Sequence, residues 1–74
     1  MKFLTITNVQ HTEVAEKIIQ ENNLDIHLEE TDPPAFLGIK AGIVLTCYGL
    51  DPEIDILKSE LDKLGIENHN IYAK

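Results

Sequence analysis

The only cysteine of this 74-residue chain, Cys47, is its one candidate for covalent chemistry. A thiol is nucleophilic as its thiolate, and a low thiol pKa requires a helix N-terminus or a nearby cation. Cys47 ends the apolar run Gly42 to Cys47 and shortly precedes the acidic segment DPEID at 51–55, whose negative charge opposes a thiolate. We therefore interpret Cys47 as a small buried hydrophobic residue, with a reactive thiol as the alternative.

A second candidate lies where the chain enters this apolar run. Gly38 and Gly42 flank Lys40, and two nearby glycines with a lysine could form a small turn that receives an anion. Lys40, Ala41 and Gly42 are therefore the candidate ligand-binding residues. The alternative is that the two glycines only let the chain bend into the next strand.

The remaining polar residues give weaker signals. His11, His27 and His69 are too scattered in the sequence to form a metal motif. The acidic run Glu29 to Asp32 could bind a hard cation or transfer protons, although such runs are usually solvated strand ends. The chain has no nucleophile elbow, HExxH, Walker loop or GxGxxG motif. We predict no metal site, no cofactor and no enzymatic activity.

Composition limits the classes of partner. Thirteen acidic residues stand against six lysines, for a formal net charge of −7, which opposes nucleic-acid binding. No apolar stretch approaches the roughly 18–20 residues that cross a membrane, and the N-terminal segment is too short and alternating for a signal peptide. A single cysteine fits a reducing compartment. We expect one cytoplasmic domain over residues 1–74 that binds neither nucleic acid nor membrane.

Apolar periodicity predicts the element order β-α-β-β-α-β. The strands are expected at Lys2–Thr7, Leu24–Glu29, Gly42–Tyr48 and His69–Ala73. The first helix is expected from Val9 or Thr12 to Asn22, with Thr12 as N-cap and Asn22-Asn23 as its end. The second is expected from the N-cap Asp51 to a C-cap at Gly65, with a buried stripe of Ile54, Leu57, Leu61 and Leu64.

This order predicts an α+β, ferredoxin-like βαββαβ split sandwich, with a four-stranded antiparallel-type sheet and two helices on one face. The first and third strands are expected in the centre as parallel neighbours, with the second and fourth outside them. The other face needs a cover, so we predict a homodimer through it. The apolar residues available there are Phe3, Phe36, Leu37, Ile39 and Tyr72.

Several short motifs resemble one family across nearly the whole chain. They are Ala15-Glu16-Lys17 followed by two aliphatic residues, a segment ending in prolines, Gly42 before an aliphatic strand, a helix rich in Leu and Glu, and a closing Gly65-Ile66 with Ile71-Tyr72. The chain resembles the small bacterial and archaeal selenium/sulfur carrier-like proteins. That resemblance implies a prokaryotic domain with a sulfur- or selenium-transfer protein as partner.

The resemblance also indicates a departure from the family. Its expected carrier is a cysteine directly before the glycine that opens the third strand, and here that position is Ala41. An alanine methyl cannot hold a chalcogen. The first hypothesis is a non-enzymatic, carrier-derived or adaptor domain that lacks the usual thiol. The alternatives are a ligand- or partner-binding regulatory module that dimerises through its uncovered sheet face, and a sulfur carrier that uses Cys47.

Overall fold

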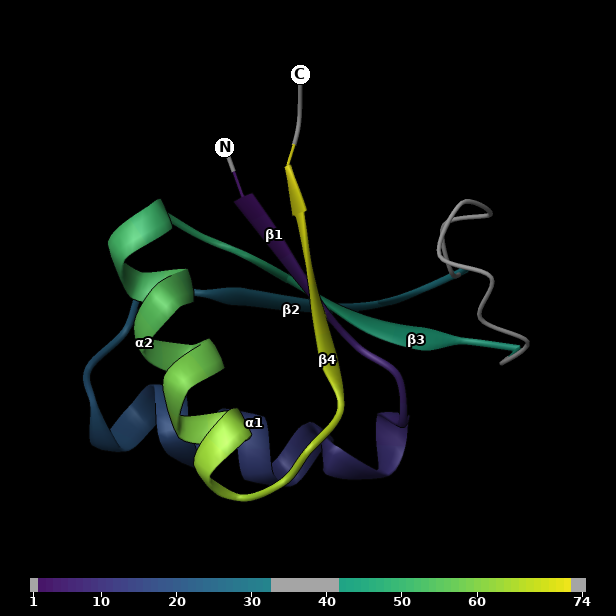
Figure 1. The fold of residues 1–74 in the computed structure, drawn as a ribbon, viewed down its shortest axis with the longest axis horizontal. Coiled ribbons are helices and arrows are strands. Elements are labelled where there is room, and N and C mark those ends of the chain that lie inside the picture. Colours follow the sequence, from purple (N-terminus) through teal and green to yellow (C-terminus); the bar gives the residue numbers. More distant parts are fainter. Residues whose placement is uncertain (1, 33–41, 73–74) are drawn as a thin grey trace.

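The computed structural model describes residues 2–32 and 42–72, which form an α+β fold with a four-stranded antiparallel sheet and two α-helices (Figure 1). This confirms the predicted α+β class and the predicted order of strands and α-helices along the chain. The elements in chain order are β1 (Lys2–Ile6), the 3₁₀ helix η1 (Val9–His11), α1 (Thr12–Glu21), β2 (His27–Thr31), β3 (Val44–Tyr48), α2 (Asp51–Lys63) and β4 (Asn68–Tyr72).

The strands lie in the order β2-β3-β1-β4, so β1 and β3 are the central pair. Their ladder is antiparallel, with Leu4 opposite Cys47, and the predicted parallel pairing is therefore wrong. The reason lies in the connections: a helical crossover keeps β1 and β2 parallel, whereas the direct return from β2 to β3 reverses the chain. The arrangement is compatible with a ferredoxin-like fold.

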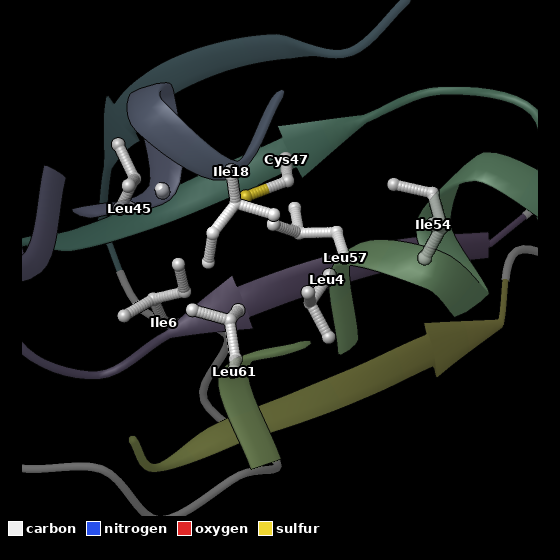
Figure 2. Packing of buried hydrophobic residues seen from close by; sticks show 9 residues of the cluster. Leu4, Ile6, Ile18, Leu45, Cys47, Ile54, Leu57 and Leu61 are labelled. Carbon is white, nitrogen blue, oxygen red and sulfur yellow. The ribbon is translucent and has the colours of Figure 1, made fainter. Parts of the chain in front are cut away.

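The hydrophobic core lies between the sheet and the two helices, which both occupy one side of the sheet (Figure 1). Figure 2 shows the side chains of this cluster converging from both layers. Fully burying one aliphatic side chain contributes about 1.5–3 kcal/mol, so this cluster is the main source of stability. Its buried members are Leu4, Ile6, Leu45 and Cys47 of the sheet with Ala15, Ile18, Ile54, Leu57 and Leu61 of the helices.

The start of α1 differs from the prediction. The side chain of Asn8 caps the preceding η1 by accepting a hydrogen bond from the Gln10 N–H at 2.9 Å. Thr12 is already helical, and its hydroxyl donates to the Val9 carbonyl, so its prediction as N-cap is wrong. Asn23 adopts a φ of 52° after the last turn, which confirms the predicted asparagine stop.

The second helix begins and ends almost where the sequence indicates. Leu50, rather than Asp51, is the N-cap, and Asp51 and Pro52 occupy the first turn. Gly65 has a φ of 73°, the left-handed conformation of the predicted C-cap. Leu64 is 60% exposed and does not belong to the buried stripe, because it is already the C-cap residue where the chain leaves the helix.

Both edge strands differ from their predicted positions. Strand β2 lies further toward the C-terminus than predicted, and β4 lies further toward the N-terminus than predicted. His27 pairs with Tyr48, the last residue of β3, so residues before His27 have no strand opposite them and β2 starts there. At the other edge, the Asn68 side chain accepts from the Lys58 ammonium at 2.7 Å and donates to Asp62 at 2.8 Å. These bonds tie the start of β4 to α2.

The same contacts affect one carboxyl group. The hydrogen bond from Asn68, followed by the charge of Lys58, lowers the pKa of Asp62 below its usual value.

Within residues 2–32 and 42–72, no helix has the length and apolar character needed to cross a membrane.

Candidate functional site

Cys47 lies in the middle of the core. It points from β3 toward the helices, its side chain is fully buried, and Figure 2 shows the sulfur among aliphatic side chains. Burial raises the pKa of the thiol from its ordinary 9.0 to about 12. A thiol in this setting is protonated at neutral pH and sheltered from reagents, as expected for a small core residue.

The predicted ligand-binding turn is described only in part. Lys40 and Ala41 lie outside the described residues. Gly42 is exposed in a bend, and a Cβ atom built on it would meet nothing within 4 Å. Its position before β3 fits the interpretation that glycine lets the chain bend into the strand.

The face of the sheet opposite the helices forms one candidate binding surface. We call it the helix-free face. Strand residues alternate between faces, so the neighbours of the core residues Leu4, Leu45 and Cys47 point to this side. Its residues are Phe3 and Thr5 of β1, Val44, Thr46 and Tyr48 of β3, His27, Glu29 and Thr31 of β2 and His69 of β4.

The centre of the helix-free face is buried although no helix packs on it. Thr5 and Val44 have no exposed surface, and Thr46 is nearly buried. Thr46 and Thr31 share a hydrogen bond between their hydroxyl oxygens at 2.7 Å. The Thr5 hydroxyl is buried and has no hydrogen-bond partner among the described residues. An unpaired buried hydroxyl costs about 1–3 kcal/mol, so Thr5 lowers the stability that this side of the sheet contributes.

One end of this face stays accessible and carries three rings, which we call the aromatic corner: Phe3, Tyr48 and His27. The Phe3 and Tyr48 rings meet edge to face, with centroids 5.1 Å apart. The His27 imidazole stacks against Tyr48 at 6.1 Å. Phe3 and Tyr48 are half-buried and His27 is exposed. Rings held in this way form a rigid apolar platform.

A shallow hollow of about 630 Å³, the corner hollow, adjoins the aromatic corner where β3 leads into α2. Leu50 contributes an exposed apolar side chain there. A Cβ atom on Gly49 would lie 3.0 Å from Ile26 and 3.2 Å from the Asp25 carbonyl oxygen, so glycine permits this close approach of the two segments. The hollow is lined by Asp25, His27, Tyr48, Gly49, Leu50, Asp51 and Pro52.

A second hollow, the edge groove, lies between α1 and the start of β2 and has a volume of about 440 Å³. Its lining is mixed, with Glu16 and Gln20 of α1 beside aliphatic residues. His27 borders both hollows. The residues that line the edge groove are Glu16, Ile19, Gln20, Ile26, His27 and Leu28.

The other polar candidates remain dispersed. His27 and His69 lie on opposite edge strands, and His11 ends η1. Glu29 and Glu30 are neighbours in β2 and therefore point to opposite faces. Within the part of the chain that the structure describes, no three histidine, cysteine or acidic side chains gather as metal ligands would.

Comparison with known proteins found no matching family model, no similar curated protein and no similar solved structure. The site must therefore be judged from its own geometry. Sequence reasoning missed the aromatic corner, because its three residues come from separate strands. The alternation of β1 placed Phe3 on the correct face, but the contact with Tyr48 and His27 depends on strand register.

Proposed function

We propose that this chain is a non-enzymatic binding module, with the ferredoxin-like split arrangement, that pairs with a second copy through its helix-free face. The aromatic corner carries this proposal. Phe3 and Tyr48 form a half-exposed platform on the only side of the sheet that the helices leave uncovered. Aromatic residues are enriched at protein interfaces, and a two-fold pair would stack two such platforms.

Charge affects how two copies of the chain would pair. Each chain carries a formal net charge of −7, so the apolar contact must overcome repulsion. Added salt screens that repulsion, and the dimer should tighten as ionic strength rises.

The kinship with selenium/sulfur carrier-like proteins belongs to the same proposal. We infer a cytoplasmic, carrier-derived domain in which Ala41 stands where the carrier cysteine is expected. The burial of Cys47 and its raised thiol pKa support the loss of the carrier role, because sulfur transfer needs an accessible thiolate. A carrier that uses Cys47 would have to open its core at each transfer.

A ligand-binding regulatory module is the second candidate. The corner hollow favours it, since the hollow is largely apolar and contains a few polar groups from Asp25, His27 and Tyr48. The hollow and the aromatic corner share His27 and Tyr48, so a ligand there would alter the proposed dimer contact.

Solution mass tests the dimer. We expect light scattering at about 100 μM protein to give twice the chain mass for the wild type and one chain mass for Phe3→Thr/Tyr48→Thr. Ile43→Thr is the matched control and should remain a dimer. It alters an exposed apolar residue directly before the first residue of β3, at the end of the strand away from Tyr48. A monomeric wild type at high salt would refute the proposal.

Incubation with a persulfide donor tests the carrier alternatives. The native protein should gain no sulfur mass, whereas the protein unfolded in denaturant should gain it at Cys47. Rapid addition of sulfur to the native chain would reject the carrier-derived reading and favour a carrier that uses Cys47.

A further inference from the structure

Strand β2 lies at the outer edge of the sheet. It is the first strand in the order β2-β3-β1-β4, and among the described residues no strand pairs with its outer side. Its ladder with β3 runs without a bulge from His27 to Thr31. The edge is short and carries Glu29 and Glu30, but His27–Thr31 contains no proline, lysine or bulge. Among the described residues, no backbone hydrogen bond outside the ladder with β3 engages the N–H and C=O groups of this strand.

Both hollows adjoin the start of this strand. Asp25 and His27 line the corner hollow, and His27 also borders the edge groove, which Ile26 and Leu28 line beside α1. An extended segment added to β2 would direct alternate side chains to the two sides of the sheet. Each hollow offers apolar and polar residues to receive them.

The charge around β2 indicates which kind of extended segment could pair with its outer edge. Asp25–Asp32 contains four acidic residues and no lysine or arginine, and Glu29 and Glu30 place one exposed carboxylate on each side of β2. Glu16 borders the edge groove and Asp51 borders the corner hollow. Two copies of this chain paired edge to edge through β2 would set like charges opposite each other, which is unfavourable. The edge therefore suits a strand of opposite charge.

We propose that the outer edge of β2 takes up an extended basic segment of a partner protein as a fifth strand. Lysine or arginine side chains of that segment lie alternately in the corner hollow and the edge groove, with their aliphatic stems on the apolar lining and their cationic heads near the carboxylates. Backbone hydrogen bonds to His27–Thr31 supply affinity, and the acidic margins select the basic sequence.

This surface adjoins the proposed dimer contact but is not the same one. The dimer uses the helix-free face and the added strand uses the edge of the same sheet, and the two share His27 and Tyr48 at the corner hollow. Peptide binding and solution mass can therefore fail independently, since the first is measured as an affinity and the second as the mass of the protein alone.

The probe is a fluorescein-labelled heptapeptide, VKKVKKV, whose lysines fall on both sides of an extended strand, measured by anisotropy at 50 mM salt. Binding by the intact chain is expected to be at least tenfold tighter than that of the same peptide with its central valine replaced by proline, because proline removes a donor and disrupts the extended ladder. The acidic peptide VEEVEEV should not bind. Equal affinity for the valine and proline peptides would overturn strand addition.

Paired charge reversals locate the site. Glu29→Lys is expected to weaken binding about tenfold, as the loss of one attraction and the gain of one repulsion would give. Glu67→Lys makes the same change in net charge next to β4, at the opposite edge, and should alter affinity by less than about twofold. Equal losses in the two variants would show only general charge attraction and would refute the assignment to β2.

Amide exchange gives an independent measurement. The bound peptide should slow exchange of outward-facing amides within His27–Thr31 and leave those of Asn68–Tyr72 unchanged. Protection confined to β4, or absent from both edges, would contradict the proposal.

Discussion

The two faces of the sheet are built from alternate residues of the same strands, yet they differ in chemistry. Toward the helices, Leu4, Leu45 and Cys47 form a continuous apolar layer, bordered on β4 by Asn70, whose buried side-chain oxygen has no partner among the described residues. On the other side, the neighbouring residues include Thr5 and Thr46. One face gains stability from burial, whereas the other retains hydroxyl groups, imidazoles and rings that can engage a partner.

This difference separates the residues that stabilise the fold from those that are available for binding. A chain of 74 residues buries a limited area, so it concentrates stabilising contacts in one layer. The aromatic corner and the corner hollow lie at the margin of that layer, where β2 and β3 meet the start of α2, and the edge groove lies between α1 and the start of β2. Substitutions there can change binding with a smaller loss of folding free energy.

Adjacent residues of β1 provide the strongest test of this contrast. Leu4→Ala should lower the free energy of unfolding by about 3 kcal/mol, because it leaves a cavity in the core. Phe3→Ala should cost about half as much, since its ring is half-buried. Chemical denaturation of both variants at low protein concentration, where a dimer adds little, measures the difference. Equal losses would mean that the two faces contribute equally.

The pH dependence of the free energy of unfolding tests the burial of Cys47 on the helix-covered side of the sheet. Unfolded Cys47 releases its proton near pH 9.0, whereas the folded chain holds it to about pH 12 because the thiol is buried. Between these values the unfolded state binds fewer protons, so stability falls as pH rises, by up to about 1.4 kcal/mol per pH unit.

Cys47→Ala is the control for this measurement, because lysines and tyrosines titrate in both proteins. Denaturation between pH 8 and 11 should show a steeper decline for the wild type than for the variant. Parallel curves would indicate that the folded thiol ionises as freely as the unfolded one.

Two threonine substitutions test the helix-free face. Their expected changes in the free energy of unfolding are smaller and have opposite signs. Thr5→Val removes a buried hydroxyl without a described partner and should raise the free energy of unfolding by about 1 kcal/mol. Thr46→Val leaves the Thr31 hydroxyl without its bond and should lower it by about 1 kcal/mol. Thermal unfolding of the two variants measures both signs, and destabilisation by Thr5→Val would reveal a partner for its hydroxyl.

The sequence predicted the elements well where local chemistry determines them. Pro52 and Gly65 marked the ends of α2, and Asn23 marked the end of α1. Errors arose where a neighbouring strand decides. Leu24 and Ile26 alternate like strand residues, but β2 begins at His27 because β3 offers no residue beyond Tyr48 to pair with.

The candidate site was less predictable. Cys47 was identified as a core residue from its apolar run and its acidic neighbours, and the structure places it there. The pairing of Tyr48 with both Phe3 and His27 depends on the register of two ladders, which short-range patterns do not determine. The closeness of Gly49 to Ile26 likewise depends on how separate segments pack, and only the glycine itself gave a hint.

The strand order has a consequence for how the chain folds. β1 and β2 belong to the first half of the chain, β3 and β4 to the second, and each of the three ladders joins a strand of one half to a strand of the other. Neither half can form a single ladder alone, so the sheet assembles in one cooperative step that must first close long stretches of backbone. Two separate peptides spanning residues 1–32 and 42–74 should therefore be unstructured apart and regain structure only when mixed.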